Sequence, residues 1–251
     1  MKTGRSNLQP DFTIIMPAYN AARFIGQSIQ SVINQTVESW ELIIIDDGST
    51  DVTGDVIEVF SRIDDRIKIY KQVNSGVAKA RNVGVTNTTG RYMTFLDADD
   101  TWDCDFLEKT RRELKVHKLV CSRYRIMGKN SSYRPRFHSR SRYLSIYEIL
   151  RNNPIGTLTV AVHSSVFRYH KFDPNFFGTE DWDMWVELAK LEDWHFSNFC
   201  AANYRSHSGG ISKNALRMYK QEKAVLLKHG VKSNFSYVTL LARFFKRLIL
   251  G

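Results

Sequence analysis

Three aspartates directly follow an apolar, strand-like stretch of the chain. Tyr92 to Leu96 is rich in β-favouring side chains, and Asp97, Asp99 and Asp100 come next with no turn residue between. Alternate aspartates on an extended chain point two carboxylates the same way, and hard divalent cations prefer such oxygen ligands. The pattern predicts a divalent-cation site that holds a diphosphate. The alternative is a solvated cluster in which Asp100 or Thr101 caps a helix.

The first 100 residues alternate between strand-like and helix-like patterns, which predicts a parallel sheet with helices on both faces. Ligands of such sheets bind at the carboxyl ends of the strands, so acids that follow strands are expected at one crevice. The expected strands are 12–16, 40–45, 67–70 and 92–96, and the expected helices are 24–33, 52–60 and 77–85.

The pattern after residue 100 is less regular. The stretch 123–142 is basic, with Tyr133 and Phe137 interleaved. It resembles a nucleic-acid-binding arm, but no nucleic-acid-binding module surrounds it, so we expect no nucleic-acid partner. The expected helices are 106–116, 182–191 and 214 onward, interrupted at Gly230, and the expected strands are 119–124, 157–162, 195–200 and 202–204.

Composition and charge restrict the class of protein. A hydrophobic content of 43% fills a core, and three widely spaced cysteines without a C-x-x-C pair disfavour disulfides or a zinc site. No secretory signal or membrane-spanning run is visible, so a cytoplasmic protein is expected. The formal net charge is −3 for residues 1–100 and +13 for residues 101–251. That asymmetry predicts an anionic partner, such as a membrane surface or a phosphorylated acceptor, against the alternative of a solvated basic surface.

Five short motifs occur in one order along the chain. They are Pro17-Ala18-Tyr19-Asn20, Asp46 to Asp51, Asn74-Ser75-Gly76 with Ala80-Arg81-Asn82, Asp97 to Asp100, and Glu180-Asp181. Together they resemble the family-2 glycosyltransferases, inverting enzymes of the Rossmann-like GT-A fold that use nucleotide-diphospho-sugars. The resemblance covers roughly residues 12–210 and implies a catalytic domain of residues 1–213, with a nucleotide-binding part (12–103) and an acceptor part (104–213), followed by a C-terminal helical extension (214–251).

The resemblance implies a donor site. Pro17 and Tyr19 would line the base and ribose, and Asp47 would accept the N3–H of uracil. Arg81 would contact the nucleotide or diphosphate, with a helix-surface role as the alternative. Asp97 would lie near the ribose and the metal, and Asp99 would hold Mn²⁺ or Mg²⁺.

The resemblance also implies acceptor-side residues. Asp181 would be the base that takes the proton of the acceptor hydroxyl. Its alternative role is to stabilise the positive end of the helix that it opens. Glu180 would orient the acceptor. His207 would provide an additional metal or phosphate contact, with an exposed loop histidine as the alternative.

A motif that the chain lacks restricts the kind of sugar transfer that we expect. The processive synthases of the family carry Gln-x-x-Arg-Trp, and none of the five tryptophans here follows an arginine. We therefore expect addition of a single sugar, most simply from a UDP-sugar, to a lipid-linked or oligosaccharide acceptor in lipopolysaccharide, capsule or exopolysaccharide synthesis.

Two other functions compete with this one. A sugar-nucleotide nucleotidyltransferase would have a Gly-rich phosphate loop after the first strand, where Pro17-Ala18-Tyr19-Asn20 stands. A non-catalytic nucleotide- or lipid-binding module would have lost its carboxylates, but Asp47, Asp97, Asp99 and Asp181 are all present.

The C-terminal residues Phe235 to Gly251 have apolar side chains at i, i+3 and i+4 spacing, with Arg243, Lys246 and Arg247 between them. This pattern predicts an amphipathic helix. Such a helix either lies on the inner face of the cytoplasmic membrane or packs on the domain.

Overall fold

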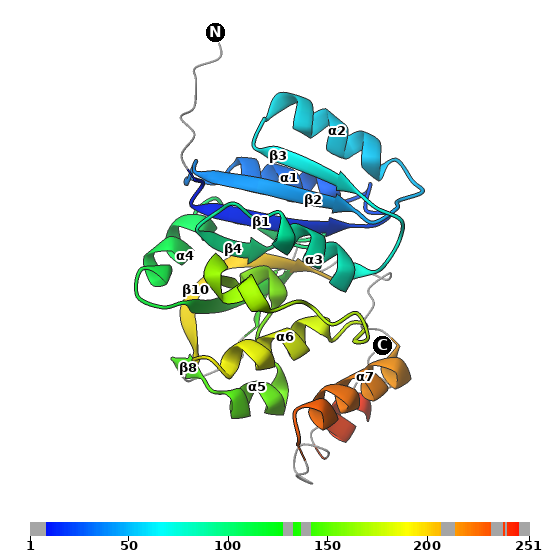
Figure 1. Ribbon diagram of the computed structural model, residues 1–251, viewed down its shortest axis with the longest axis vertical. Coiled ribbons are helices and arrows are strands. Elements are labelled where there is room, and N and C mark those ends of the chain that lie inside the picture. Colours follow the sequence, from blue (N-terminus) through cyan, green and yellow to red (C-terminus); the bar gives the residue numbers. More distant parts are fainter. Residues whose placement is uncertain are drawn as a thin grey trace.

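One mixed sheet organises the computed structural model, which describes residues 9–127, 142–206, 214–231, 238 and 240–245, and the backbone of 133–136. The strand order is β3-β2-β1-β4-β9-β6-β10-β5, with β7 beside β6 and β8 beside β10 (Figure 1). The strands are β1 (Phe12–Ala18), β2 (Trp40–Asp46), β3 (Ile67–Lys71), β4 (Tyr92–Phe95), β5 (Thr101–Trp102), β6 (Leu119–Met127), β7 (Tyr133–Arg136), β8 (Tyr143–Leu144), β9 (Ala161–His163) and β10 (Trp194–Arg205).

The N-terminal part is the predicted parallel unit. β1 pairs in parallel with β2 and β4, and β2 pairs in parallel with β3. Between them run α1 (Ile25–Ile33), α2 (Thr53–Ile63) and α3 (Val77–Thr86). Because these strands are parallel, their carboxyl ends meet at one edge of the sheet, where the predicted donor-site residues follow them.

Helices cover both faces of the sheet, as predicted. Alternate residues of β2 point to opposite faces, so Ile43 and Ile45 belong to one core while Leu42 and Ile44 belong to the other. The first core also contains residues of α3, α5 (Ile146–Asn152), α6 (Glu180–Ala189) and α7 (Ala215–Lys228); α3 and α6 lie in front of the sheet in Figure 1. The second contains residues of α1, α2 and α4 (Phe106–Leu114).

The second half departs from the predicted strands in two places. Residues Thr157–Thr159 form a 3₁₀ turn, η1, and only β9 pairs there, antiparallel to both β4 and β6. The two short strands expected at 195–200 and 202–204 are one strand, β10, whose pairing with β6 shifts register around Cys200. Such an irregularity breaks the local alternation, so the sequence pattern resembled two strands.

The helix-cap alternative for the aspartate cluster is wrong. Asp100 is followed by β5, which pairs antiparallel with β10, and α4 begins only at Phe106. The short strand turns the chain back toward β10 before any helix can start, so Asp100 and Thr101 cap no helix.

The described part of the C-terminal extension packs on the domain. Leu240 is fully buried in the same core as α6, and the ring of Phe244 lies 5.3 Å from that of Tyr219. Val238, Leu241 and Phe245, at helical spacing, are 61%, 43% and 56% exposed. None of the helices within the described ranges is long and apolar enough to cross a membrane.

Candidate active site

A tight turn after β4 presents the predicted metal-binding aspartates. The Asp100 N–H donates to the Asp97 carbonyl at 3.0 Å, which leaves Asp97 and Asp99 partly exposed while Asp100 is buried. Arg205, at the end of β10, holds this turn. Its backbone N–H donates to Asp100 Oδ1 at 2.8 Å, and its Nε donates to the Asp99 carbonyl at 2.8 Å.

The charges in this turn fit a divalent cation. Burial raises the pKa of Asp100 well above its ordinary value, and the nearby charges of Asp99 and Asp97 raise it further. A bound cation would offset this crowding of carboxylates, and oxygen donors suit Mn²⁺ or Mg²⁺. Within the described ranges, neither Asp97 nor Asp99 belongs to a group of three side chains whose metal-ligating atoms lie close together. The phosphates of a donor would therefore have to supply further ligands to the metal ion.

Arg81 connects this turn to the start of α6. It is only 3% exposed, so the alternative of a helix-surface role is wrong. Its Nη2 donates to Asp97 Oδ1 and its Nη1 donates to Glu180 Oε1, both at 2.8 Å. Burial opposes the guanidinium charge, but Asp97, Glu180 and Asp181 outweigh burial and keep the pKa of Arg81 above its ordinary value. The bridge brings the aspartate turn and the acceptor-side motif together.

Asp181 lies in the first turn of α6, as predicted, and its carboxylate is held in a defined orientation. Thr157 Oγ1 donates to Oδ2 at 2.8 Å, and the Trp182 N–H donates to Oδ1 at 2.6 Å. Burial raises the pKa of Asp181 above its ordinary value, although Arg81, Thr157 and Trp182 act in the opposite direction. A carboxylate with a raised pKa is a better proton acceptor than an ordinary aspartate.

Glu180 is buried, and both of its carboxylate oxygens are engaged. Besides the bond from Arg81, the Gly178 N–H donates to Oε2 at 2.7 Å. Burial raises the pKa of Glu180, and the charge of Arg81 opposes that rise. In this structure Glu180 therefore positions Arg81 and the start of α6.

Asp47 shapes the turn of residues 74–76. It is buried at the end of β2; Gln72 Nε2 and the Ser75 N–H donate to its Oδ1 at 2.6 and 2.8 Å, and the Gly76 N–H donates to its Oδ2 at 2.8 Å. The neighbouring Gly48 has φ = 73°, and a Cβ there would lie 2.7 Å from the Asn74 nitrogen. Each carboxylate oxygen has two acceptor positions, so Asp47 retains capacity for a further donor such as a base N–H.

The loop after β1 is joined to the loop after β2. Pro17 is buried within β1, and Tyr19 is 51% exposed beyond it. Asn20, with φ = 48°, accepts the Thr50 N–H at 2.8 Å through Oδ1 and donates its own N–H to Ser49 Oγ at 3.0 Å. Both loops therefore lie at the same edge of the sheet as Asp47. His207 lies outside the described residues.

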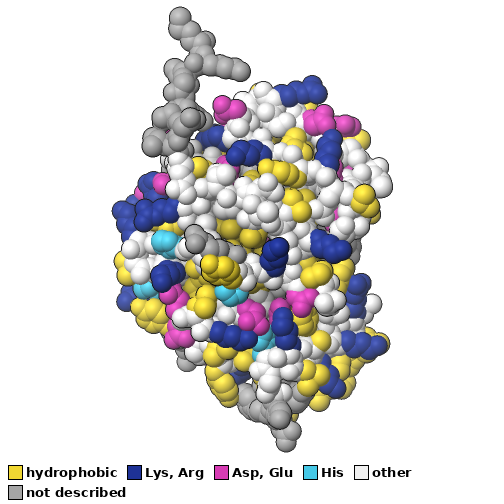
Figure 2. Space-filling model, viewed as in Figure 1, with side chains coloured by type: hydrophobic (Ala, Val, Ile, Leu, Met, Phe, Trp, Pro, Cys, Tyr) yellow, Lys and Arg dark blue, Asp and Glu magenta, His cyan; other side chains and the backbone are white. Residues whose placement is uncertain are grey.

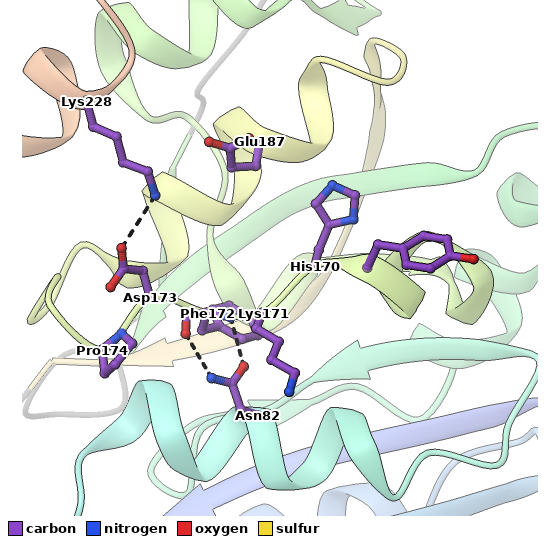
Figure 3. Close-up of a pocket in the computed structure, with 9 residues that line it drawn as sticks. Asn82, His170, Lys171, Phe172, Asp173, Pro174, Glu187 and Lys228 are labelled. Carbon is purple, nitrogen blue, oxygen red and sulfur yellow. Dashed lines mark hydrogen bonds and ion pairs between the residues drawn. The ribbon is translucent and has the colours of Figure 1, made fainter.

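Asn82 connects α3 to the segment that precedes α6. Its Nδ2 donates to the Phe172 carbonyl and its Oδ1 accepts the Phe172 N–H, both at 2.8 Å (Figure 3). The Phe172 ring in turn lies 5.6 Å from the Arg81 guanidinium. The sequence pattern did not predict the roles of Asn82, Thr157 and Arg205. Their partners lie far away along the chain, and only the flanking motif at Arg81-Asn82 pointed to one of them.

The sequence matches the family described as "Glycosyl transferase family 2" over residues 13–175, more than half of the chain. The chain belongs to glycosyltransferase family 2. It is therefore an enzyme, and the nucleotidyltransferase and non-catalytic alternatives are wrong. The matched range contains the motifs from Pro17 to Asp100 and ends before Glu180 and Asp181.

Two curated relatives of this family-2 enzyme cover most of its length. TuaG of Bacillus subtilis (strain 168), a glycosyltransferase named for teichuronic acid biosynthesis, is 34% identical over 241 residues, which are 93% of this chain and 95% of TuaG. The UDP-Glc:alpha-D-GlcNAc-diphosphoundecaprenol beta-1,3-glucosyltransferase WfgD of Escherichia coli is 32% identical over 219 residues, 85% of this chain and 84% of WfgD.

Solved structures share the GT-A fold of this enzyme. S. aureus TarS 1–349 in complex with UDP has a TM-score of 0.69 at 18% identity, over 96% of this chain and 72% of TarS 1–349. The mannosyltransferase PcManGT from Pyrobaculum calidifontis, in complex with GDP-Man and Mn²⁺, has a TM-score of 0.69 at 15% identity, over 98% of this chain and 77% of PcManGT.

Proposed function

We propose that this glycosyltransferase transfers one sugar from a UDP-sugar to a hydroxyl of a lipid-linked acceptor in bacterial surface-polysaccharide synthesis. The names of two relatives support this proposal, since TuaG is named for teichuronic acid and WfgD for UDP-Glc and a diphosphoundecaprenol-linked sugar. PcManGT holds GDP-Man on a similar fold, so the preference for uracil rests on WfgD and on Asp47.

The observation that carries the proposal is the bridge through Arg81. It joins Asp97, on the donor side, to Glu180, which precedes Asp181 on the acceptor side. Transfer requires the two substrates to be held in one geometry, and a buried, doubly paired guanidinium fixes the two halves of the site relative to each other.

On the donor side, Pro17, Tyr19 and Asp47 line the base and ribose in this proposal, and Asp99 and Asp97 hold Mn²⁺ or Mg²⁺. When bound, the ion offsets the charge that develops on the leaving nucleoside diphosphate. The Mn²⁺ of PcManGT supports this choice of ion. Arg81, already paired to Asp97, stabilises this turn rather than replacing the ion.

On the acceptor side, Asp181 is the general base. The acceptor oxygen attacks the anomeric carbon, its proton passes to the Asp181 carboxylate, and the bond to the diphosphate breaks with its electron pair on the leaving phosphate. Attack from the face opposite the leaving group inverts the anomeric centre. Glu180 acts by holding Arg81 and the start of α6. The contact expected of His207 stays a prediction.

We also propose that the enzyme works at the cytoplasmic face of the membrane, where a lipid-linked acceptor is found. Residues 101–251 have a formal net charge of +13. Figure 2 shows basic and apolar side chains together at the lower right, where Figure 1 places α7. The exposed Val238, Leu241 and Phe245 would add apolar contact to this basic surface.

The donor assignment is tested by thermal shift with a panel of sugar nucleotides and Mn²⁺, on the wild type and on Asp99→Asn. A ligand that binds only the folded state raises its stability, so the true donor should raise Tm most. This shift should depend on Mn²⁺ and be strongly reduced in Asp99→Asn. An equal, metal-independent shift in both proteins would contradict the proposed metal site. A response to GDP-sugars but not to UDP-sugars would contradict uracil as the base of the donor nucleotide.

A further inference from the structure

The turn η1 carries one side chain, that of Thr157, to the proposed general base. Thr157 Oγ1 donates to Asp181 Oδ2 at 2.8 Å, and the two residues are 24 positions apart in the chain. Thr157 is only 8% exposed, so little water is available to replace its hydroxyl as a donor. The bond therefore depends on where η1 lies against the start of α6.

The turn closes on itself without the Thr157 hydroxyl. The Thr159 N–H and the Thr159 hydroxyl both donate to the Gly156 carbonyl, at 2.8 and 2.7 Å. The Val160 N–H donates to the Thr157 carbonyl at 3.1 Å. These bonds define the shape of the turn, and they leave the Thr157 hydroxyl available to Asp181.

The two strands on either side of the aspartate turn hold η1 in place. Thr94 Oγ1, in β4, donates to the Val160 carbonyl at 2.7 Å. Trp102 Nε1, in β5, donates to the Leu158 carbonyl at 2.8 Å. Both donor side chains are buried, and in the chain they flank residues 97–100. The segment that carries the donor-side aspartates therefore also fixes the position of η1.

The Asp181 carboxylate depends on this hydroxyl for its charged form. Within the described ranges, Oδ2 of Asp181 has one hydrogen-bond donor, the Thr157 hydroxyl. Burial raises the pKa of Asp181, whereas the charge of Arg81 and the bond from Thr157 lower it. Asp97 adds to the rise, and the neighbouring Glu180 is paired to Arg81. Loss of the hydroxyl would leave Oδ2 buried without a donor, which disfavours the charged carboxylate.

We propose that Thr157 is a positioning residue for transfer, whose hydroxyl holds the Asp181 carboxylate toward the acceptor while β4 and β5 hold η1. The inference rests on the proposed function, in which Asp181 takes the acceptor proton. It adds a second connection between the two halves of the site. Arg81 joins the aspartate turn to Glu180, and η1 joins the strands that flank that turn to Asp181.

The test measures release of the nucleoside diphosphate by the full-length enzyme over a range of pH, with Mn²⁺ and the sugar nucleotide that the thermal-shift panel identifies. Water is the acceptor: its oxygen bonds to the anomeric carbon as the bond to the diphosphate breaks, and its proton passes to Asp181. Thr157→Val keeps the shape of the side chain but removes the hydroxyl. It should lower kcat by ~10-fold or more, since misplacement of a reacting group by about 1 Å can cost roughly 10²-fold.

The pH profile separates this role from a purely structural one. In Thr157→Val the fall of kcat on the acid side should move to higher pH, because Asp181 loses a bond that favours its charged form. The KM for the donor should change little. Thr157→Ser keeps the hydroxyl and should retain the kcat and the pH profile of the wild type.

Thr159→Val is the matched control, because the Thr159 hydroxyl lies in the same turn but donates to Gly156. The Gly156 carbonyl still accepts the Thr159 N–H, so this variant should behave like the wild type. Circular dichroism of each variant checks folding. Thr157→Ala takes the place of Thr157→Val if the valine variant does not fold.

Three results would overturn the inference and leave the proposed function intact. Thr157→Val could show the kcat and pH profile of the wild type, Thr157→Ser could be as impaired as Thr157→Val, or Thr159→Val could change in the same way as Thr157→Val. Asp181→Asn is measured in parallel. A kcat of Asp181→Asn equal to that of the wild type would instead contradict the proposed function, and the inference with it.

Discussion

Asp181 differs from an ordinary helix-opening aspartate in its surroundings. Such a residue would stabilise the positive end of the helix through its charge alone. Here two donors, Thr157 Oγ1 and the Trp182 N–H, fix the carboxylate, and burial raises its pKa. Fixed orientation and raised basicity are the properties that a general base requires.

The substitution Asp181→Asn should lower kcat by roughly 10²–10⁴-fold, because the amide keeps the shape but accepts no proton. Donor affinity should change little, since the proposed base acts on the acceptor. Transfer assays give kcat, and calorimetry with the UDP-sugar gives the donor Kd. A collapse of donor binding would show that Asp181 contacts the nucleotide or its metal instead.

Asp100 gives a prediction for stability against pH. Its folded-state pKa is raised well above the ordinary value of 3.8, so the folded protein binds this proton more tightly than the unfolded chain. The proton on Asp100 therefore stabilises the folded protein fully below pH 3.8, and this stabilisation is lost as pH rises through the folded-state pKa. Asp100→Asn removes this dependence, and its Oδ1 can still accept the Arg205 N–H.

Asp100→Asn should be more stable than the wild type at pH 7, and the difference should shrink toward pH 4. Urea denaturation of both proteins at several pH values, without metal, measures this. A difference independent of pH would show that Asp100 is ionised in the folded protein.

Gly84 allows α3 to lie close against the sheet. A Cβ at this position would lie 2.5 Å from Ile15 Cγ2 and 3.1 Å from Ile45 Cδ1. The residue therefore allows α3, which carries Arg81 and Asn82, to approach β1 and β2. Gly26 in α1 is different, since a Cβ there would meet Phe60 at an ordinary 3.6 Å.

Gly84→Ala should destabilise the protein by about 1–3 kcal/mol, because it overpacks the contact between α3 and β1. Gly26→Ala is the matched control and should stabilise by ~0.5–1 kcal/mol through helix propensity. Urea denaturation gives both values. Equal stability of the two variants would mean that α3 can move away from the sheet without loss.

At the scale of the whole molecule, the C-terminal extension both packs on the domain and leaves an apolar stripe exposed. Leu240 is buried, and the Arg243 guanidinium lies 5.1 Å from the Trp182 ring, next to Asp181 in sequence. Removal of the whole extension would therefore disturb the fold. Substitution of the exposed residues Leu241 and Phe245 tests the proposed membrane contact separately from packing.

The double substitution Leu241→Ser with Phe245→Ser should weaken co-sedimentation with anionic liposomes while Tm stays unchanged. Binding of the wild type should fall with added salt and be weaker on neutral liposomes, because basic residues attract anionic lipids. Val59→Ser, at an apolar residue of α2 that is 61% exposed, is the control and should bind like the wild type. Unchanged binding by the double variant would show that the exposed apolar stripe does not contact the membrane.

The sequence by itself determined the parallel unit of residues 12–95 and the family. Strand and helix periods are local properties of the chain, and β1, β2 and β4 follow from them within one or two residues. Acidic residues that directly follow parallel strands must lie at the edge of the sheet where those strands end. The positions of Asp47, Asp97 and Asp99 could therefore be predicted from the sequence alone.

Only the tertiary structure decided which groups meet. Arg81 resembled a possible surface residue because charge patterns do not reveal burial, and its partner Glu180 lies 99 positions away. The meeting of Thr157 with Asp181 depends likewise on how η1 lies against the start of α6. Pairings of this kind arise from packing between distant segments, and no local period in the sequence encodes them.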